Sequence, residues 1–361
     1  MLGLYIHIPF CKQKCFYCNF FSEKYDTVLV DKYIDALTDY AVQFKNKKID
    51  SIYIGGGTPS VLSLKQIQKL LQALNNIFSL SIMQEFTFEL NPESTSESKL
   101  KILKNYGVNR LSIGLQSVED KSLKFLGRIH GFKAFCTAYD MALKEGFSNI
   151  NIDLIYGLPG QNMQDWEKAL EKVLLLNSQH LSLYPLSIEQ STSFFETGIS
   201  TNDDIQRDMY DKTIEILAEN GYNHYEVSNW AKRDGESFHN SNYWRNFEYI
   251  GLGAGAAGYF ERRRYKNVAN VQRYINLIKN NVDLKTENEY IDDKLYKTET
   301  IILGLRLLNE GVNIDCFSAY KHYKTLSECL KDKTLKKENN KIKIAKKYVF
   351  VFNQIVSKFI D

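Results

Sequence analysis

The first half of the chain alternates between short apolar runs and longer amphipathic stretches. The apolar runs predict buried strands, and they are L-G-L-Y-I-H-I-P, S-I-Y-I-G-G-G-T-P, E-F-T-F-E-L-N-P-E, R-L-S-I-G-L-Q, I-N-I-D-L-I-Y-G-L-P-G and H-L-S-L-Y-P-L-S-I. Between these runs, helix-like stretches lie at about 26–46, 64–74, 96–105 and 164–176. Six strands that alternate with helices indicate a parallel α/β fold with right-handed crossovers.

Six strand–helix units suit an incomplete barrel better than the closed eight-fold one. We therefore expect an α/β fold in which residues 1–230 form a partial (β/α)6 barrel and residues 231–289 form an extension. From about residue 290 the pattern changes to an amphipathic helix, a hairpin around N-N between lysine-rich segments, and a last apolar element, Y-V-F-V-F-N-Q-I-V. Helices followed by a hairpin predict a small winged-helix-like domain at 290–361.

Polar residues gather where the predicted strands end, which is where such folds carry their sites. The run Gly55–Pro59 follows the second strand, Glu89 and Gln116 end the third and fourth, and Asp153 lies within the fifth. Each has an ordinary structural explanation, as a turn, a loop contact or a buried capping group. Because the carboxyl ends of parallel strands share one rim, these features together predict a binding site at the barrel mouth.

Cys11, Cys15 and Cys18 follow the first strand at CxxxCxxC spacing. Six cysteines in 361 residues, with no secretion signal, argue against a disulfide framework and indicate a reducing cytoplasm. A structural zinc site takes four N or S ligands, and His7, the other nearby candidate, is expected on the polar side of a strand. Iron–sulfur clusters normally use four closely spaced cysteines, so three would leave one iron open to an external ligand.

Composition indicates a soluble globular protein, because hydrophobic residues make up 44% and charged residues 25% of the chain. No apolar run reaches the ~18 residues of a membrane span. The formal net charge of +3 gives no reason to expect a nucleic-acid partner. Residues 331–347 do hold eight lysines against two acidic residues, but lysine is frequent throughout, so a solvated lysine face is favoured over a basic wing that binds nucleic acid.

With these motifs assembled, the sequence resembles the radical S-adenosylmethionine (SAM) superfamily, whose cluster motif is CxxxCxxC. In that superfamily the amino and carboxylate groups of SAM chelate the open iron, so SAM would be the missing ligand. The resemblance is closer to the anaerobic coproporphyrinogen III oxidase family and its HemW-type heme chaperone branch. It spans residues 2 to about 310 and rests on Y-I-H-I-P-F-C, G-G-G-T-P, E-L-N-P-E, R-L-S-I-G-L-Q-S, N-I-D-L-I-Y-G-L-P and H-N-S-N-Y-W.

The resemblance implies a 4Fe–4S cluster on the three cysteines and a SAM pocket beside it. The residues that would line the pocket are Tyr5, Tyr17, Gly57, Thr58, Glu89, Gln116, Arg128 and Asp153. Their chemistry agrees with this role, since glycine lets backbone groups approach the methionine end of SAM. Gln116 and Asp153 suit ribose hydroxyls, and Arg128 can pair with a carboxylate. Which polar group meets which SAM atom stays open.

Two departures separate the chain from the oxidases. The oxidases extend the motif to CxxxCxxCxC, whereas Phe20 follows Asn19 here. The oxidases also carry a segment ahead of the first strand, whereas this chain begins almost on that strand. Both differences are typical of the chaperone branch, which also shares the segment H-N-S-N-Y-W at residues 239–244.

Residues 239–244 could contact heme. His239 can supply an imidazole nitrogen to heme iron, Tyr243 and Trp244 offer flat faces to a porphyrin, and Arg245 could meet a propionate. The alternative is a surface loop with one unpaired histidine. The resemblance favours heme contact and makes His239 a candidate axial ligand.

We therefore expect a cytoplasmic heme chaperone that binds a 4Fe–4S cluster, SAM and heme and transfers heme to acceptor proteins. Its partners would be heme and heme-acceptor proteins, including acceptors at the membrane surface. A homodimer is compatible with the resemblance. Nucleic acid is not expected as a partner. The alternative is an enzyme that converts coproporphyrinogen III to protoporphyrinogen IX without oxygen. A third hypothesis is a radical SAM nucleic-acid modifier that uses the lysine-rich segment.

Overall fold

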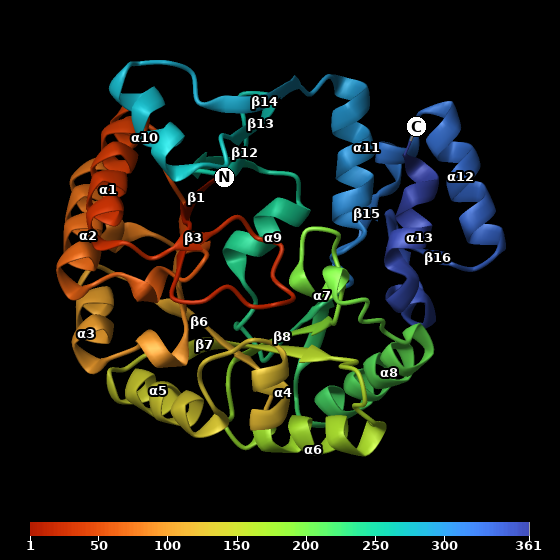
Figure 1. Ribbon diagram of the computed structural model, residues 1–361. Coiled ribbons are helices and arrows are strands. Elements are labelled where there is room, and N and C mark those ends of the chain that lie inside the picture. Colours follow the sequence, from red (N-terminus) through yellow and green to blue (C-terminus); the bar gives the residue numbers. More distant parts are fainter. Residues whose placement is uncertain (361) are drawn as a thin grey trace.

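A computed structural model describes residues 1–360, with Ser81 and Tyr320 described by their backbone alone. One open sheet has the strand order β14-β13-β12-β11-β1-β4-β5-β6-β7-β8-β10-β9 (Figure 1). Its six central strands run parallel; they are β1 (Leu2–Ile8), β4 (Ser51–Gly56), β5 (Glu85–Leu90), β6 (Arg110–Gln116), β7 (Asn149–Tyr156) and β8 (His180–Pro185). These are the six strands that the apolar runs predict, so the partial barrel is confirmed.

Helices cover the outer face of this sheet (Figure 1). They are α1 (Thr27–Ala41), α2 (Leu64–Phe78), α3 (Glu97–Asn105), α4 (Asp120–Phe125), α5 (Phe132–Lys144), α6 (Met163–Leu174) and α8 (Asp203–Glu219). The apolar spacing explains how they pack: in α2, for example, Leu70, Leu71 and Leu74 are buried on one face, and Ser63 caps the helix start in a capping box. The helix expected over 26–46 ends at residue 41.

The chain after β8 rejoins the same sheet at both edges. After the short helix α7 (Ser193–Glu196), the strands β9 (Asn223–Glu226) and β10 (Asn229–Ala231) extend the β8 edge antiparallel. Helix α9 (Phe238–Trp244) then leads to β11 (Glu248–Leu252), which runs parallel to β1. The strands β12 (Ala257–Phe260), β13 (Arg263–Asn267) and β14 (Lys285–Tyr290) follow, with α10 (Val271–Lys279) before β14. The extension expected at 231–289 is thus continuous with the barrel sheet.

The glycines at the end of β11 and just after it allow close packing. A β-carbon on Gly251 would lie 1.9 Å from the carbonyl oxygen of Ala257, and Gly253, at a φ of +107°, would bring one within 2.4 Å of the Tyr33 hydroxyl. Only glycine lets these backbones approach so closely. The glycines thus allow close packing between β11, β12 and α1.

Residues beyond 290 form a smaller unit at the open side of the barrel (Figure 1). Its elements are α11 (Asp293–Gly304), β15 (Val312–Asn313), α12 (Tyr320–Lys331), β16 (Leu335–Glu338), β17 (Lys341–Ile344) and α13 (Phe352–Val356). The strands form a separate sheet in the order β15-β17-β16, and the hairpin β16–β17 lies where the sequence predicts it. The unit is joined to β9 by a bridge between Glu226 and Leu307.

Short 3-10 helices complete the described chain, at Val42–Phe44, Pro59–Val61, Leu80–Ile82, Pro92–Ser94, Ile314–Phe317, Lys346–Val351 and Ser357–Phe359. A two-stranded parallel pair, β2 (Phe10–Cys11) and β3 (Glu23–Lys24), holds the segment between them as a loop. Across residues 1–360, no helix combines the length and apolar character needed to cross a membrane.

Candidate functional site

The cysteine loop, residues 11–22, is fixed across the carboxyl end of the barrel strands. Pairing of β2 with β3 closes its two ends. The backbone of Phe16 donates to the carbonyl of Leu126 at 3.1 Å and accepts from Phe194 N–H at 3.1 Å. The loop is therefore tied both to the end of α4 and to α7, on two sides of the barrel mouth.

The three thiols of this loop are free and lie within electrostatic reach of one another. Cys11 is buried, while Cys15 and Cys18 are half-buried. Burial raises the pKa of Cys11 and of Cys18, and the Cys15 thiol raises both further. Within residues 1–360, no three His, Cys, Asp or Glu side chains converge on one metal-ion position. The CxxxCxxC spacing of the three cysteines suits a 4Fe–4S cluster, in which each thiolate binds a separate iron.

Gly57 forms the wall beside the cysteine loop. A β-carbon at this position would lie 2.9 Å from Phe10 N and 3.0 Å from Cys11 Sγ. The backbone is held there because Gly57 N–H donates to Ile8 O at 2.9 Å and Thr58 N–H donates to Phe10 O at 2.9 Å. The structure thus provides a cradle that a side chain would fill, next to the first cysteine.

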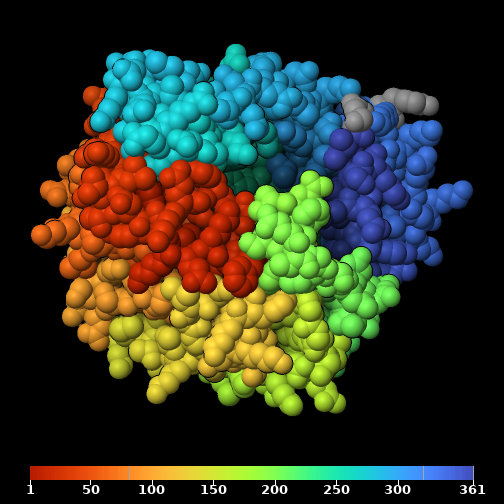
Figure 2. All heavy atoms as spheres, viewed as in Figure 1, coloured from red at the N-terminus to blue at the C-terminus, as the bar shows by residue number. Residues whose placement is uncertain are grey.

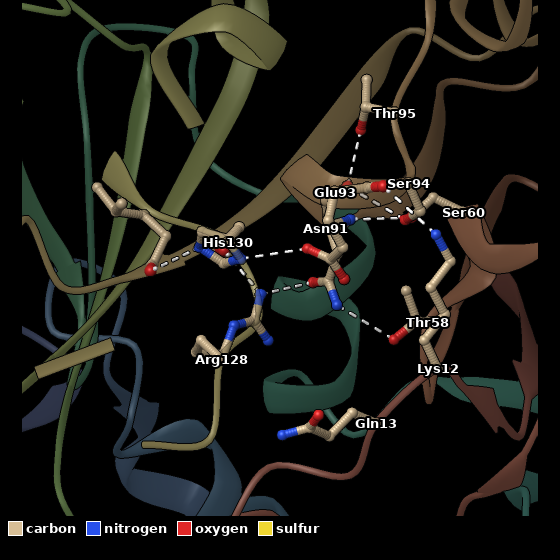
Figure 3. A network of polar contacts seen from close by, with 12 residues as sticks. Lys12, Gln13, Thr58, Ser60, Asn91, Glu93, Ser94, Thr95, Arg128 and His130 are labelled. Carbon is tan, nitrogen blue, oxygen red and sulfur yellow. Dashed lines mark hydrogen bonds and ion pairs between the residues drawn. The ribbon is translucent and has the colours of Figure 1, made fainter. Parts of the chain in front are cut away.

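A hydrogen-bonded network joins residues that follow β4, β5 and β6 (Figure 3), and it extends to two of the cysteines. Thr58 Oγ1 donates to Cys11 Sγ at 3.5 Å, and Asn91 Nδ2 donates to Thr58 Oγ1 at 3.2 Å. Arg128 Nη2 donates to Asn91 Oδ1 at 2.8 Å, and Arg128 Nη1 donates to Cys15 Sγ at 3.6 Å. Asn91 is absent from the residues that the sequence singles out, although it stands within E-L-N-P-E.

Arg128 brings a positive charge with a spare donor to this network. Burial opposes its charge, but the neighbouring Tyr17 and Cys15 groups raise its pKa. The carboxylate of Glu93 balances the charge of Arg128. Although Glu93 is largely buried, the hydrogen bond from His130 and the charge of Arg128 lower the pKa of Glu93. Among the described residues, Arg128 Nε is buried and has no hydrogen-bond partner. An unpaired buried donor on a guanidinium suits an anionic group such as the SAM carboxylate.

Tyr5 and Tyr17 line the same region from β1 and the cysteine loop. The Tyr5 hydroxyl shares a hydrogen bond of 2.8 Å with His7 Nδ1, and His7 Nε2 lies 2.9 Å from Phe21 O in the cysteine loop. Burial lowers the pKa of His7, so its ring is neutral. Tyr17 packs on a small apolar cluster that includes Leu126. His7 therefore supports the loop from the polar face of β1, as expected.

Glu89 stands on β5 between the barrel interior and the glycine turn. Tyr53 Oη donates to Glu89 Oε1 at 2.7 Å, and Gly56 N–H donates to Oε2 at 3.1 Å. Burial raises the pKa of Glu89 to about 7, although the Tyr53 hydrogen bond acts in the opposite direction. Around neutral pH this carboxyl is therefore divided between its protonated and ionised forms.

This shift makes a prediction about stability. Between pH 4.5 and about pH 7 the folded chain keeps the Glu89 proton that the unfolded chain has lost, so the free energy of unfolding falls as pH rises. Glu89→Gln should remove this contribution, which is at most about 1.4 kcal/mol per pH unit. Urea unfolding of cluster-free protein at several pH values measures how the free energy of unfolding depends on pH. Glu93→Gln is the control, because the pKa of Glu93 is lowered and not raised. Equal slopes of the free energy of unfolding against pH for wild type and Glu89→Gln would contradict the assignment.

Gln116 and Asp153 occupy adjacent strands. The register between β6 and β7 shifts at Gly114–Gln116, and Gln116 has a φ of +70°, which is uncommon for a residue other than glycine. Around Gly114, a β-carbon would meet Gln116 Nε2 at 3.0 Å and Arg128 Nη2 at 3.2 Å. Asp153 accepts from Ser112 Oγ at 3.1 Å, and burial raises its pKa despite this bond. The bulge thus brings the side chains of Gln116 and Arg128 close to Gly114.

His239 lies apart from the cysteine loop, at the other end of β1 and β4. Its Nδ1 shares a hydrogen bond of 2.8 Å with Ser51 Oγ at the start of β4, and its Nε2 one of 2.7 Å with Tyr243 Oη. The side chain is 1% exposed, and burial lowers its pKa to about 3. The ring of Tyr53 lies 5.5 Å away between centroids. His239 is thus a neutral group near the Glu89–Tyr53 pair. The alternative of a surface loop with an unpaired histidine is wrong, because residues 238–244 form helix α9 and His239 is buried and hydrogen-bonded.

The space-filling view shows a hollow on this face of the molecule (Figure 2). It is bounded by the cysteine loop in red, the α7 region in green, the cyan segment of α10 and β14, and the C-terminal unit in dark blue (Figure 2). Exposed aromatic residues come from the elements around it: Phe16 and Phe20 from the cysteine loop, Tyr184 from β8 and Phe195 from α7.

Comparisons with known proteins agree with this geometry. Residues 5–173 match the radical SAM superfamily. The chain is 38% identical to the heme chaperone HemW of Lactococcus lactis, over 99% of this chain and 96% of that protein. It is also 38% identical to the heme chaperone HemW of Bacillus subtilis, over 85% and 83%.

Among solved structures, the coproporphyrinogen III oxidase HemN of Escherichia coli, a radical SAM enzyme, superimposes with a TM-score of 0.87 at 22% identity. The match covers 99% of this chain and 89% of that one. At this identity the likeness establishes the fold, while the nearly full-length sequence matches establish the family. The chain belongs to the radical SAM superfamily and, within it, to the HemW family.

Proposed function

We propose that this protein is a heme chaperone that carries a 4Fe–4S cluster, binds SAM and delivers heme to acceptor proteins in the cytoplasm. The observation that carries the proposal is the 38% identity over 99% of the chain with a protein named as a heme chaperone. Anaerobic reconstitution followed by heme titration tests it: we expect saturable binding of heme, and no binding would contradict the proposal.

The residues around the barrel mouth fit the cluster and SAM. When bound and reduced, such a cluster would supply one electron to SAM. In our proposal, the three cysteines hold the cluster and Gly57 lets the backbone approach SAM. Arg128 meets the SAM carboxylate with its unpaired Nε, and Gln116 and Asp153 meet ribose hydroxyls. The covering loop and α7 would keep water from the site.

We predict that Gln116→Ala and Asp153→Ala each weaken SAM binding and leave the cluster intact, because neither residue is a cluster ligand. Losing a hydrogen bond to a bound ligand costs about 1–3 kcal/mol when its partner stays unpaired, which is roughly a 5- to 150-fold loss of affinity. Calorimetry on reconstituted protein measures it. Gln84→Ala, at the amino end of β5, is the matched control; wild-type affinity in both site variants would place SAM elsewhere.

For heme, we propose contact with α9 through Tyr243 and Trp244, which are half-buried. His239 remains our candidate axial ligand on one condition. Its Nδ1 is oriented by Ser51, as the second nitrogen of a metal-bound imidazole commonly is. Its Nε2, however, is engaged by the Tyr243 hydroxyl. Iron would have to replace that hydroxyl, and α9 would have to open to admit heme.

The oxidase is the second candidate function, favoured by the TM-score of 0.87 to the Escherichia coli enzyme. Against it stands Phe20, at the position where the oxidases have a cysteine. This side chain lies in the cysteine loop, is 62% exposed and cannot act as a thiol. Turnover of coproporphyrinogen III separates the two candidates.

A further inference from the structure

The side chain of Asn91 stands between Thr58 and Arg128 (Figure 3). Its Nδ2 donates to Thr58 Oγ1 at 3.2 Å, and its Oδ1 accepts from Arg128 Nη2 at 2.8 Å. These partners donate in turn to Cys11 Sγ at 3.5 Å and to Cys15 Sγ at 3.6 Å. One amide thus orients the donors of Thr58 and Arg128 toward two of the sulfurs.

Both atoms of the amide are needed for this orientation. A threonine hydroxyl that accepts a hydrogen bond from Asn91 Nδ2 has its own hydrogen free to point at Cys11. The guanidinium is a rigid fork, so fixing Arg128 Nη2 on Asn91 Oδ1 and on Gly114 O, at 3.0 Å, aims Nη1 at Cys15. A side chain that only accepts, or only donates, can serve one partner and not the other.

The backbone of Asn91 is held independently of this side chain. Its N–H donates to Ser60 Oγ at 2.9 Å, and its carbonyl accepts from Thr95 Oγ1 at 2.9 Å and from Ser94 Oγ at 3.2 Å. Substitution of the side chain therefore leaves the turn after β5 with its own hydrogen bonds. A change in the cluster caused by such a substitution can be separated from a change in the fold.

We propose that Asn91 is a positioning residue that raises the reduction potential of the cluster by aiming Thr58 and Arg128 at the sulfurs of Cys11 and Cys15. Hydrogen bonds to cluster sulfurs stabilise the more negative, reduced state and so raise its potential. The inference rests on the proposed cluster and is independent of heme. In the couple concerned, the oxidised cluster takes up one electron from an external reductant, and no bond forms or breaks.

Asn91→Asp is the sharpest variant, because it changes the shape of the side chain very little. Its carboxylate still accepts from Arg128 but has no hydrogen to donate to Thr58, so the Thr58 hydroxyl turns toward the carboxylate and away from Cys11. The added negative charge also opposes reduction. Asn91→Ala removes the support of both donors, and Thr58→Val removes only the hydrogen bond to Cys11.

The experiment is an anaerobic spectroelectrochemical titration of reconstituted, SAM-free protein, with iron and sulfide content measured on the same samples. For Asn91→Asp and Asn91→Ala we expect at least a ten-fold fall in the ratio of reduced to oxidised cluster at the wild-type midpoint, which is about 59 mV. Thr58→Val should give a smaller shift in the same direction. Asn109→Ala, just before β6 and beside the amino end of β5, should keep the wild-type potential.

A full cluster with unchanged potential in both Asn91 variants would overturn the inference and leave the proposed cluster standing. A wild-type protein that assembles no cluster would instead overturn the cluster, and the inference with it. If the alanine variant fails to fold, the potential of the nearly isosteric Asn91→Asp variant still decides between these outcomes.

Discussion

Replacement of Cys11, Cys15 or Cys18 by alanine is expected to abolish stable assembly of the iron–sulfur cluster. A 4Fe–4S cluster in this loop has three protein ligands, so each substitution leaves two thiolates and two open irons. The remaining cysteines cannot substitute. Cys136 lies on α5, and Cys316 and Cys329 belong to the C-terminal unit, whereas the cysteine loop is fixed by β2, β3 and its backbone bonds to α4 and α7.

Iron and sulfide analysis after anaerobic reconstitution, with the visible absorption spectrum, measures the effect. Cys136→Ala is the matched control, because it removes a half-buried thiol away from the loop and should leave the cluster intact. A variant of the cysteine loop that retains a full cluster with a normal spectrum would contradict the ligand assignment.

The second large effect is expected in the porphyrin assays: the reconstituted protein should bind heme and should leave coproporphyrinogen III unconverted. The oxidase motif CxxxCxxCxC has a further cysteine two residues after the third one. Phe20 occupies that position here, and its ring can pack against other groups but can neither ligate iron nor transfer a proton.

His239→Ala should change the absorption spectrum of bound heme, because the imidazole is our candidate axial ligand. Tyr243→Phe is an informative companion, since it removes the hydroxyl that engages His239 Nε2 and keeps the ring; it should retain the wild-type spectrum. An unchanged spectrum in His239→Ala would move the ligand to another residue without affecting the chaperone assignment.

The sequence predicts the barrel and the cysteine loop because both depend on local patterns. Each parallel strand is a short apolar run that ends in turn residues, and the CxxxCxxC spacing lies within one loop. The position of β11 could not be predicted in this way. Its residues 248–252 pair in parallel with β1, at the start of the chain, and no local pattern encodes a contact between segments so far apart.

The same reason limits what could be predicted about the site. The carboxyl ends of the strands bring Gly57, Glu89, Gln116 and Asp153 to one region by topology alone. No such rule predicts the position of His239. Its location depends on α9 packing beneath the barrel, where Ser51 and Tyr243 engage both ring nitrogens. The sequence does not single out Asn91, because an asparagine in a turn usually bonds to the backbone and its side-chain contact here depends on Arg128 from another loop.

The most direct test of the chaperone assignment is one anaerobic preparation of the reconstituted protein, divided between a heme titration and a coproporphyrinogen III assay with SAM and reductant. We predict saturable heme binding in the first and no multiple-turnover conversion in the second. Formation of protoporphyrinogen IX over many turnovers would contradict the account and make the protein an oxidase.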